Sequence, residues 1–248
     1  MTRLVRYTLN PDLPVTAPDH HPDVRRGTME EFEAQPAARL LPSVAPSKIV
    51  CVGRNYADHA KELGNAVPEE PLIFLKPPSS LNAPGGAIVF PGLSQLLSYE
   101  GELGVVIGKR IRGAASEQEA MDAVLGYTIV NDVTARDLQK KDGQWTRGKG
   151  FDTFCPVGPW VVPKAEVDLP GLRVKTRVNG ETKQDGPVTD MIFGVGAIIV
   201  FVTRFMTLEP GDLIATGTPP GVGPLVPGDA VEVEIPGIGA LANRVVAE

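Results

Sequence analysis

Three carboxylates stand where they could bind one metal ion together. Glu100 and Glu102 are two residues apart and precede the apolar run 103–107. Side chains alternate faces along a strand, so this spacing places both glutamates side by side with Gly101 behind them. Two carboxylates so close repel each other unless a cation lies between them. Asp132 offers a third oxygen ligand at the end of the apolar run 125–131.

This set of ligands predicts the kind of metal. Oxygen-only ligands select a hard cation, so we expect Mg²⁺ or Mn²⁺, with Ca²⁺ as a further candidate. Zinc is disfavoured because neither a thiol nor a paired imidazole is near these positions. The pattern also fits a plainer alternative, in which the two glutamates are solvated and pair with neighbouring Lys or Arg side chains.

A histidine and a glutamate form a second candidate pair. His59 and Glu62 are three residues apart in a segment, 54–63, that we expect to be a short helix. At that spacing they can touch. A carboxylate bonded to one ring nitrogen fixes the tautomer and leaves the other nitrogen free to take a proton from water. The alternative is an ordinary exposed pair on a helix surface.

Two further segments could contribute to a site. Residues 211–223 bring a strand into a glycine-rich turn, where backbone N–H groups and the Thr218 hydroxyl could hold a carboxylate. Residues 138–150 are polar and basic, and could form a mobile cover that carries Lys149. Each could equally be a plain surface turn or loop. Neither segment is a phosphate-binding loop or a dinucleotide fingerprint, so nucleotide binding is disfavoured.

The composition limits the class of protein. The 248 residues are 42% apolar and carry a net charge of −6. A mildly acidic chain with scattered Lys and Arg is not expected to bind nucleic acid. Cys51 and Cys155 lie among apolar residues and predict buried free thiols. Residues 1–6 lack the apolar core of a signal peptide, and the apolar run 195–202 is too short to span a bilayer. We therefore expect a soluble cytoplasmic protein with no membrane partner.

The elements that would position these residues are mostly strands. Short apolar or alternating runs predict strands at residues 49–52, 72–76, 100–109, 126–133, 160–162, 172–178 and 231–235. Helices are predicted at 54–63, with Asn55 as N-cap and Gly64 as C-terminal cap, and at 117–124. Residues 194–206 fit either a strand or a buried helix, and the length of the segment favours the helix. The fold class is therefore α+β and rich in β. Two prolines in residues 40–47 indicate a linker, so we place a small N-terminal segment at 1–46 and a catalytic domain at 47–248.

Six motifs in this order resemble the fumarylacetoacetate hydrolase superfamily, over residue 46 to the end. They are Val-Gly-Arg-Asn-Tyr-Ala-Asp-His-Ala-Lys-Glu (52–62), Phe-Leu-Lys-Pro (74–77), Tyr-Glu-Gly-Glu-Leu-Gly-Val-Val-Ile-Gly-Lys (99–109), Asn-Asp-Val-Thr-Ala-Arg-Asp-Leu-Gln (131–139), Lys-Gly-Phe-Asp-Thr-Phe-Cys-Pro-Val-Gly-Pro (149–159) and Gly-Asp-Leu-Ile-Ala-Thr-Gly-Thr-Pro-Pro-Gly-Val-Gly (211–223). The resemblance implies a mixed β-sheet roll with short helices, a homodimer and one Mg²⁺ or Mn²⁺.

The resemblance also implies a role for each site residue. The metal ligands fall on Glu100, Glu102 and Asp132. The catalytic histidine falls on His59, completed by Glu62, and the active-site lysine falls on Lys149. The substrate contacts fall on Arg136, Gln139 and Thr218. The true fumarylacetoacetases have a further Asp ligand before the histidine, which is missing from 51–53 here, and a much larger N-terminal domain. The chain is therefore similar to the short bacterial branch.

The predicted activity is divalent-metal-dependent and acts on small 2-oxo acids, either acylpyruvate-like dicarboxylic acids or diketo acids, through an enolate. We expect C–C bond hydrolysis, because the His59–Glu62 pair then has a defined task. An isomerase or decarboxylase of the 2-hydroxyhepta-2,4-diene-1,7-dioate or oxaloacetate type, as in aromatic catabolism, is the alternative. A non-catalytic small-molecule-binding protein is a more distant one.

Overall fold

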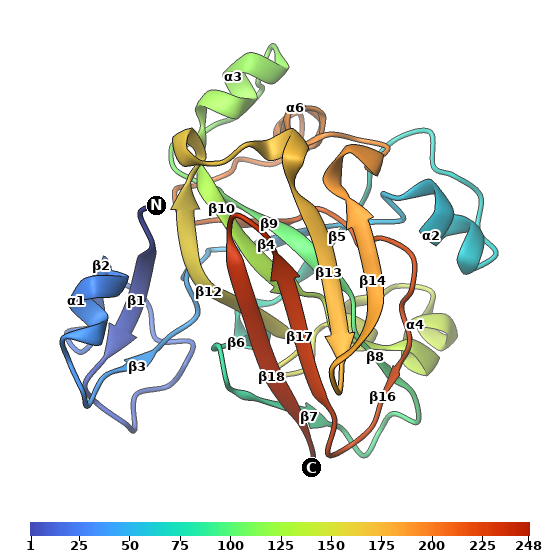
Figure 1. Cartoon of the computed structure of the whole chain (residues 1–248). Helices are drawn as coiled ribbons and strands as arrows, with labels where there is room; N and C mark the ends of the chain where they lie inside the picture. Colours follow the sequence, from blue (N-terminus) through green and yellow to red (C-terminus); the bar gives the residue numbers. More distant parts are fainter.

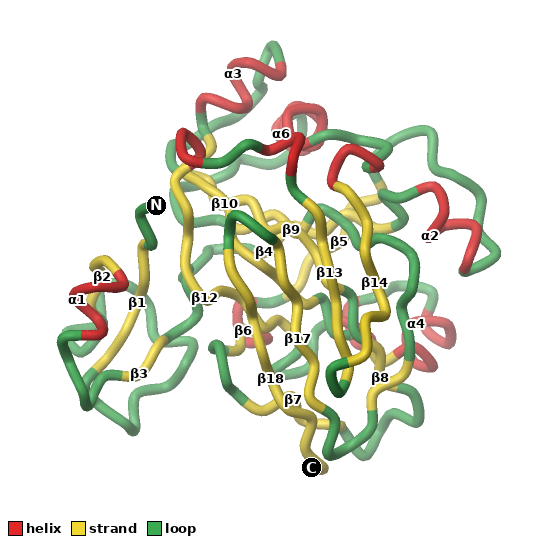
Figure 2. The backbone as a smooth tube through the Cα atoms, in the orientation of Figure 1, coloured by secondary structure: helices red, strands yellow, loops and turns green.

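Two stacked β-sheets make up most of the molecule (Figure 1). The computed structural model describes all residues, 1–248. In the backbone view, strands and connecting loops dominate and the helices are short and peripheral (Figure 2). The α+β, β-rich class predicted from the sequence is confirmed.

The larger sheet contains ten strands and carries most of the site. Its main path runs β2-β1-β12-β10-β9-β15-β4-β5, with β3 paired to β1 and β6 paired to β12. The strands span β1 Leu4–Thr8, β2 Arg25–Thr28, β3 Arg39–Leu40, β4 Ile49–Gly53, β5 Leu72–Lys76, β6 Leu81–Asn82, β9 Gly101–Ile107, β10 Val124–Asn131, β12 Cys155–Pro163 and β15 Leu213–Ala215.

A five-stranded sheet lies across one face of the larger sheet, in the order β14-β13-β17-β18-β7. These strands are β7 Ala87–Phe90, β13 Arg173–Val178, β14 Glu181–Pro187, β17 Ala230–Ile235 and β18 Gly239–Ala247. A third, small sheet joins β8 Leu97–Ser98 to β11 Thr134–Ala135 and β16 Pro224–Leu225.

The helices lie at the periphery of the two sheets. They are α1 Met29–Glu33, α2 Ala57–Glu62, α3 Glu117–Asp122, α4 Arg136–Asp142, α5 Thr146–Lys149 and α6 Val195–Thr203, with short 3₁₀ turns at Pro78–Ser80, Lys164–Glu166, Leu169–Gly171 and Val188–Asp190. The predicted helix at 194–206 is thus confirmed as α6. None of the helices has the length and apolar content needed to cross a membrane.

Two local predictions were wrong. The helix expected from residue 54 begins only at Ala57, and its N-cap is Tyr56 rather than Asn55. The Asn55 side chain instead bridges to other segments, which removes it from the helix end. The alternative that 138–150 is a plain surface loop is also wrong, because this stretch contains most of α4 and all of α5. Whether it forms a mobile cover stays a prediction. Gly64 does adopt the expected left-handed conformation, with φ of 70°.

The main core fills the space between the two sheets. Side chains from one face of β9, including Leu103, Val105 and Ile107, pack against Val174 of β13 and Val233 of β17. The opposite face of β9 carries Glu102 and Val106, and Val106 belongs to a separate, smaller apolar cluster. Strand alternation therefore sends one set of β9 side chains into the core between the sheets and places Glu102 on the opposite face.

Gly101 is required by the close approach of the sheets. A Cβ at this position would collide with the Thr176 hydroxyl and lie 2.9 Å from Cγ1 of Val233. The glycine in the Glu-Gly-Glu motif therefore lets the two glutamates lie on one face while their strand packs tightly against the five-stranded sheet.

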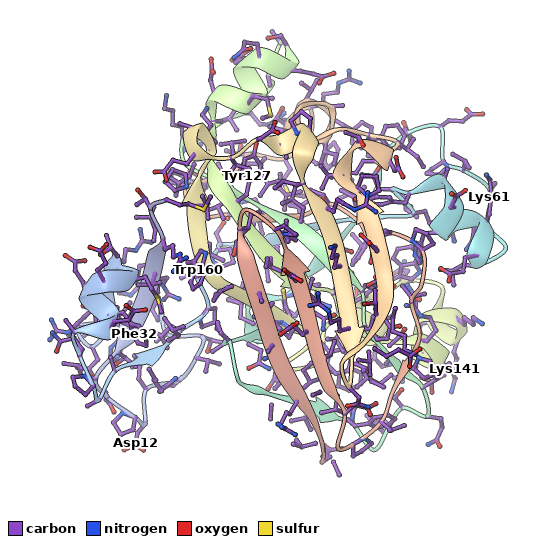
Figure 3. All side chains as sticks on the ribbon, viewed as in Figure 1. Asp12, Phe32, Lys61, Tyr127, Lys141 and Trp160 are labelled. Atoms are coloured by element: carbon purple, nitrogen blue, oxygen red, sulfur yellow. The ribbon has the colours of Figure 1, made fainter.

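The N-terminal 46 residues form β1, β2, α1 and β3, which lie beside the body of the molecule (Figure 1). β1 joins the edge of the large sheet through pairing of Leu4 with Val161 of β12. Trp160 lies on the adjoining edge, and Phe32 lies on α1 farther out (Figure 3). The division of the chain after residue 46 stays a prediction.

We predict that neither thiol reacts in the folded protein. Cys51 and Cys155 are free and buried. Burial raises the pKa of the Cys155 thiol to about 12 and raises that of Cys51 well above its usual value. Since the thiolate is the reactive form, a thiol-specific disulfide reagent at pH 8 should label neither cysteine on the folded protein. Both should react in guanidinium chloride. Rapid labelling of the folded chain would contradict the buried placement.

Candidate active site

The pairing of two neighbouring strands brings the three carboxylates together. In the β9–β10 ladder Glu102 lies opposite Val130, and Gly101 lies opposite Asn131. One step further, the backbone N–H of Asp132 donates to the Glu100 carbonyl over 2.8 Å. Glu100 and Asp132 are therefore cross-strand neighbours, and Glu102 follows two residues along the same face. Their ligand oxygens all lie within 4.8 Å of one another, and all three residues are buried.

Three buried cations contact this triad. Nζ of Lys149 donates to Oε2 of Glu100 and to Oδ2 of Asp132, both over 2.6 Å. Nζ of Lys76 donates to Oδ1 of Asp132 over 2.6 Å and to the Val133 carbonyl over 3.1 Å. Arg136 donates to Oε1 of Glu100 over 2.5 Å. The triad with Lys76, Lys149 and Arg136 is called the charged cluster below.

Lys76 is a member that the sequence analysis did not assign. It is the last residue of β5, and 1% of its surface is exposed. Sequence alone presents it as a lysine at a strand end, where a solvated ammonium is the ordinary outcome. The Phe-Leu-Lys-Pro motif was the signal that could have identified it.

The cluster shifts the pKa values of its members in opposite directions. Burial by itself raises the pKa of Glu100, but the charges of Lys149 and Arg136 outweigh it and hold that pKa well below its usual range. Burial also opposes the charged form of Lys149, yet the carboxylates of Asp132 and Glu100 raise its pKa above the ordinary value. Both groups are therefore held charged at neutral pH.

Glu102 differs from the other two acids because no cation lies within 4 Å of it. Its carboxylate accepts one hydrogen bond, from the backbone N–H of Gly217 over 2.8 Å. Burial, followed by the nearby charges of Asp132 and Glu100, raises its pKa well above the usual value. A buried carboxylate beside two others, with too little positive charge around it, fits a site for a divalent cation. The residues present therefore fit Mg²⁺ or Mn²⁺.

His59 and Glu62 are in contact. His59 is buried, and its Nδ1 lies 3.2 Å from Oε2 of Glu62. The Glu62 carboxylate also accepts the backbone N–H of Gly221 over 3.1 Å. A carboxylate fixed from two sides holds the imidazole in one orientation and favours a proton on Nδ1, which leaves Nε2 able to accept one.

The glycine-rich turn binds carboxylates of the protein itself. Gly217 and Gly221 donate to Glu102 and Glu62, as described above. The Thr218 hydroxyl donates to the Gly101 carbonyl over 2.7 Å and accepts from Gln184 over 2.7 Å. This turn was expected to hold a substrate carboxylate, whereas two of its backbone donors bond Glu62 and Glu102 of the protein. A substrate contact of Thr218 stays a prediction.

All nine residues predicted from the sequence line one cavity of about 460 Å³. This is a size typical of sites for small molecules. Within it, Arg136 also donates to Oε1 of Gln139 over 2.9 Å. The cavity wall further includes Arg54, Lys140, Trp145 and Phe74, which the sequence analysis did not assign. The individual roles of the nine residues stay predictions.

Comparisons with known proteins agree with this geometry. The family profile described as "Fumarylacetoacetate (FAA) hydrolase C-terminal" matches residues 48–246. The chain is 46% identical over 216 residues to the oxaloacetate tautomerase YisK of Bacillus subtilis (strain 168), which covers 82% of this chain and 71% of that protein.

Two solved structures extend the likeness to three dimensions. The 2-hydroxyhepta-2,4-diene-1,7-dioate isomerase from Mycobacterium marinum superposes with a TM-score of 0.84 at 41% identity, covering 100% of this chain and 99% of that one. The fumarylpyruvate hydrolase from Pseudomonas aeruginosa, solved in complex with Mn²⁺ and pyruvate, gives 0.77 at 34% identity, covering 85% of this chain and 92% of that one.

We predict that Glu102→Gln abolishes tight metal binding and stabilises the metal-free protein. Loss of one of three ligand carboxylates should weaken Mn²⁺ binding by at least about 100-fold, measured by isothermal titration calorimetry. A raised pKa means that proton binding to Glu102 stabilises the fold, and that this stability is lost as the pH rises through that pKa. The uncharged glutamine removes the loss, so with EDTA at alkaline pH the variant should melt higher than the wild type.

The exposed Glu181→Gln on β14 is the matched control, since it removes the same charge outside the cavity. It should leave both Mn²⁺ affinity and melting temperature unchanged. Wild-type Mn²⁺ affinity in Glu102→Gln would rule out the metal assignment.

Proposed function

This chain belongs to the fumarylacetoacetate hydrolase family and is an enzyme of that family, and we propose that it hydrolyses a C–C bond of acylpyruvates with the help of a divalent metal. The observation that carries the proposal is the His59–Glu62 contact, which opens on the same cavity as the three carboxylates. A hydrolase needs a base that can activate water next to its electrophilic group. In this cavity His59 would be the base, and the three carboxylates would hold the metal that makes the substrate carbonyl electrophilic.

The carboxylates of Glu100, Glu102 and Asp132 would hold the metal, for which Mg²⁺ and Mn²⁺ are the candidates. When bound, such an ion supplies Lewis acidity to the carbonyl and carboxylate oxygens of a 2-oxo acid. The ammonium of Lys149, fixed 2.6 Å from two of these carboxylates, provides a permanent positive charge for a substrate oxygen that becomes negative.

His59 and Glu62 would activate the water. Glu62 holds the proton on Nδ1, and Nε2 accepts a proton from the attacking water. The water oxygen bonds to the acyl carbonyl carbon, and the bond from that carbon to the pyruvate methylene breaks. The electron pair passes to the pyruvate unit as its enolate, which takes up a proton at C3. Acylpyruvate and water thus give pyruvate, the second carboxylate and one proton.

A second candidate is tautomerisation, isomerisation or decarboxylation of a related 2-oxo acid. The 46% identity to a protein named oxaloacetate tautomerase and the 41% identity to one named 2-hydroxyhepta-2,4-diene-1,7-dioate isomerase favour it. These reactions also pass through an enolate, so the charged cluster would serve them as well. They differ from hydrolysis in that no water attacks. His59 would then transfer a proton to or from a carbon atom of the substrate. The homodimer that the resemblance implies also stays a prediction.

We predict that His59→Ala lowers kcat for acylpyruvate hydrolysis by about 10²- to 10⁴-fold, the usual contribution of a general base. Mn²⁺ affinity should stay unchanged, because His59 is not among the three ligands. Pyruvate release can be followed with lactate dehydrogenase and NADH. The control is His20→Ala, a histidine in the N-terminal 46 residues outside the cavity. Near wild-type turnover of His59→Ala would exclude the water-activating role.

A substrate comparison separates the two candidates. With Mg²⁺ or Mn²⁺, the purified enzyme should release pyruvate from acylpyruvates faster than it converts oxaloacetate or 2-hydroxyhepta-2,4-dienedioate. The keto–enol change of oxaloacetate is followed by ultraviolet absorbance, and carbon dioxide release by a coupled assay. Turnover confined to oxaloacetate or the dienedioate would transfer the conclusion to the second candidate.

A further inference from the structure

Arg54 holds an unusual backbone conformation at the cavity wall. It lies between β4 and α2 with φ of 57°, in the left-handed region that non-glycine residues seldom occupy. Such conformations persist where the surroundings enforce them, and they concentrate at functional sites. Arg54 lines the cavity and is half-buried. It makes no ion pair with any acid of the protein within 4 Å.

The residues beside Arg54 fix its position. The Asn55 side chain donates to the carbonyls of Phe193 over 3.0 Å and Thr216 over 2.8 Å, and accepts the N–H of Phe193 over 2.9 Å. On the other side, Gly53 packs so tightly on Trp145 that a Cβ there would lie 2.6 Å from the indole ring. The strained backbone is therefore held on both sides, and Arg54 is presented to the cavity from a rigid support.

The Arg54 guanidinium lies over the Trp145 ring, with its carbon 5.8 Å from the ring centroid. Trp145 in turn packs edge-on against Phe74, with centroids 5.1 Å apart. When a guanidinium stacks on an aromatic face, the N–H groups at the edge of the guanidinium stay free to pair with a carboxylate.

The cationic side chains of the cavity form two groups. Those on the buried floor are paired with acids, and those at the more exposed rim are not. On the floor, Lys149 and Arg136 are paired with Glu100 and Asp132. At the rim, Arg54 and the exposed Lys140 lack acidic partners. The one acid of the wall outside the triad is Glu62, which is engaged by His59 and Gly221. The rim thus carries two positive charges that nothing in the protein neutralises.

We infer that Arg54, assisted by Lys140, binds a second carboxylate at the far end of the substrate, and that the enzyme therefore prefers dicarboxylic 2-oxo acids. The inference rests on the proposed function, in which the 2-oxo acid end of the substrate lies on the floor beside the triad. Arg54 is then a specificity-determining residue that takes no part in bond breaking. A half-buried guanidinium that stacks over an aromatic ring and lacks an acidic partner favours a dianion over a substrate of the same length that ends in a methyl group.

The test compares two substrates of equal length that differ only at the far end. 2,4-Dioxoheptanedioate ends in a carboxylate and 2,4-dioxoheptanoate ends in a methyl group. In Arg54→Gln, kcat/KM for the diacid should fall by about 10- to 100-fold, the effect of one lost charged hydrogen-bonding partner. That for the monoacid should change less than about threefold. Arg54→Lys should recover part of the loss, because it keeps the charge without the planar fork.

The controls protect the test against misfolding and against general charge effects. Arg54→Gly also deletes the charge but relieves the positive φ, so it should fold at least as well and show the same selective loss. Lys141→Gln removes the same charge next to Lys140, from a side chain that projects into solvent away from the body of the protein (Figure 3), and should leave both substrates unaffected. An equal loss for both substrates, or an unchanged preference for the diacid, would overturn the inference.

Binding separates this inference from the proposed reaction. With Mn²⁺ present, the diacid should raise the melting temperature of the wild type more than the monoacid does, and Arg54→Gln should abolish that difference. If neither compound is hydrolysed, the proposed hydrolysis fails while the binding difference still decides the role of Arg54. An equal thermal shift by the two compounds on the wild type would refute that role.

Discussion

The mutual neutralisation of charges below the cavity is the constraint on which the rest of the site depends. Six ionisable side chains are buried there together, and any one of them left alone would be costly. Two lysines and an arginine offset two of the acids through bonds of 2.5–2.6 Å. Removing one partner would leave a buried charge uncompensated, so these contacts fix each carboxylate oxygen in place. The third acid, Glu102, lacks such a partner, which leaves its carboxylate available to a proton or to a divalent cation.

The sheets supply the rigidity that this arrangement needs. Odd-numbered residues of β9 enter the core between the sheets, and on the opposite face Glu102 reaches the site. Shifting β9 by one residue would send Glu102 into the dry core and Leu103 into the site, so hydrophobic burial enforces the register that places the carboxylates. Gly101 permits the sheet contact behind the glutamates. The apolar core therefore acts on the chemistry by fixing which oxygens lie within 4.8 Å.

Local spacing singled out the candidate pairs of this site, and the resemblance to the family supplied the other residues and the roles. The spacing of Glu100 and Glu102 and the spacing of His59 and Glu62 each depend on one element, and both contacts follow from strand or helix periodicity. The overall β-rich class followed from alternation in the same way. Lys76 and Arg54 could not be identified from local spacing, because the residues that they contact lie far away in the sequence. Asn55 shows the same limit, because a typical capping residue is used to tie three segments together.

The floor and the rim of the cavity differ in their charge balance. The charged cluster contains three acids and three bases, so its formal charge is zero before any ion binds. A divalent cation at the triad would bring that sum to two positive charges in a buried site. A 2-oxo acid carries one negative charge on its carboxylate and gains a second as it becomes an enolate, so the floor is matched to the enolate rather than to the resting substrate. The charge on Arg54 lies outside this balance. The floor therefore favours the reaction common to many 2-oxo acids, while the rim is left to distinguish one acid from another.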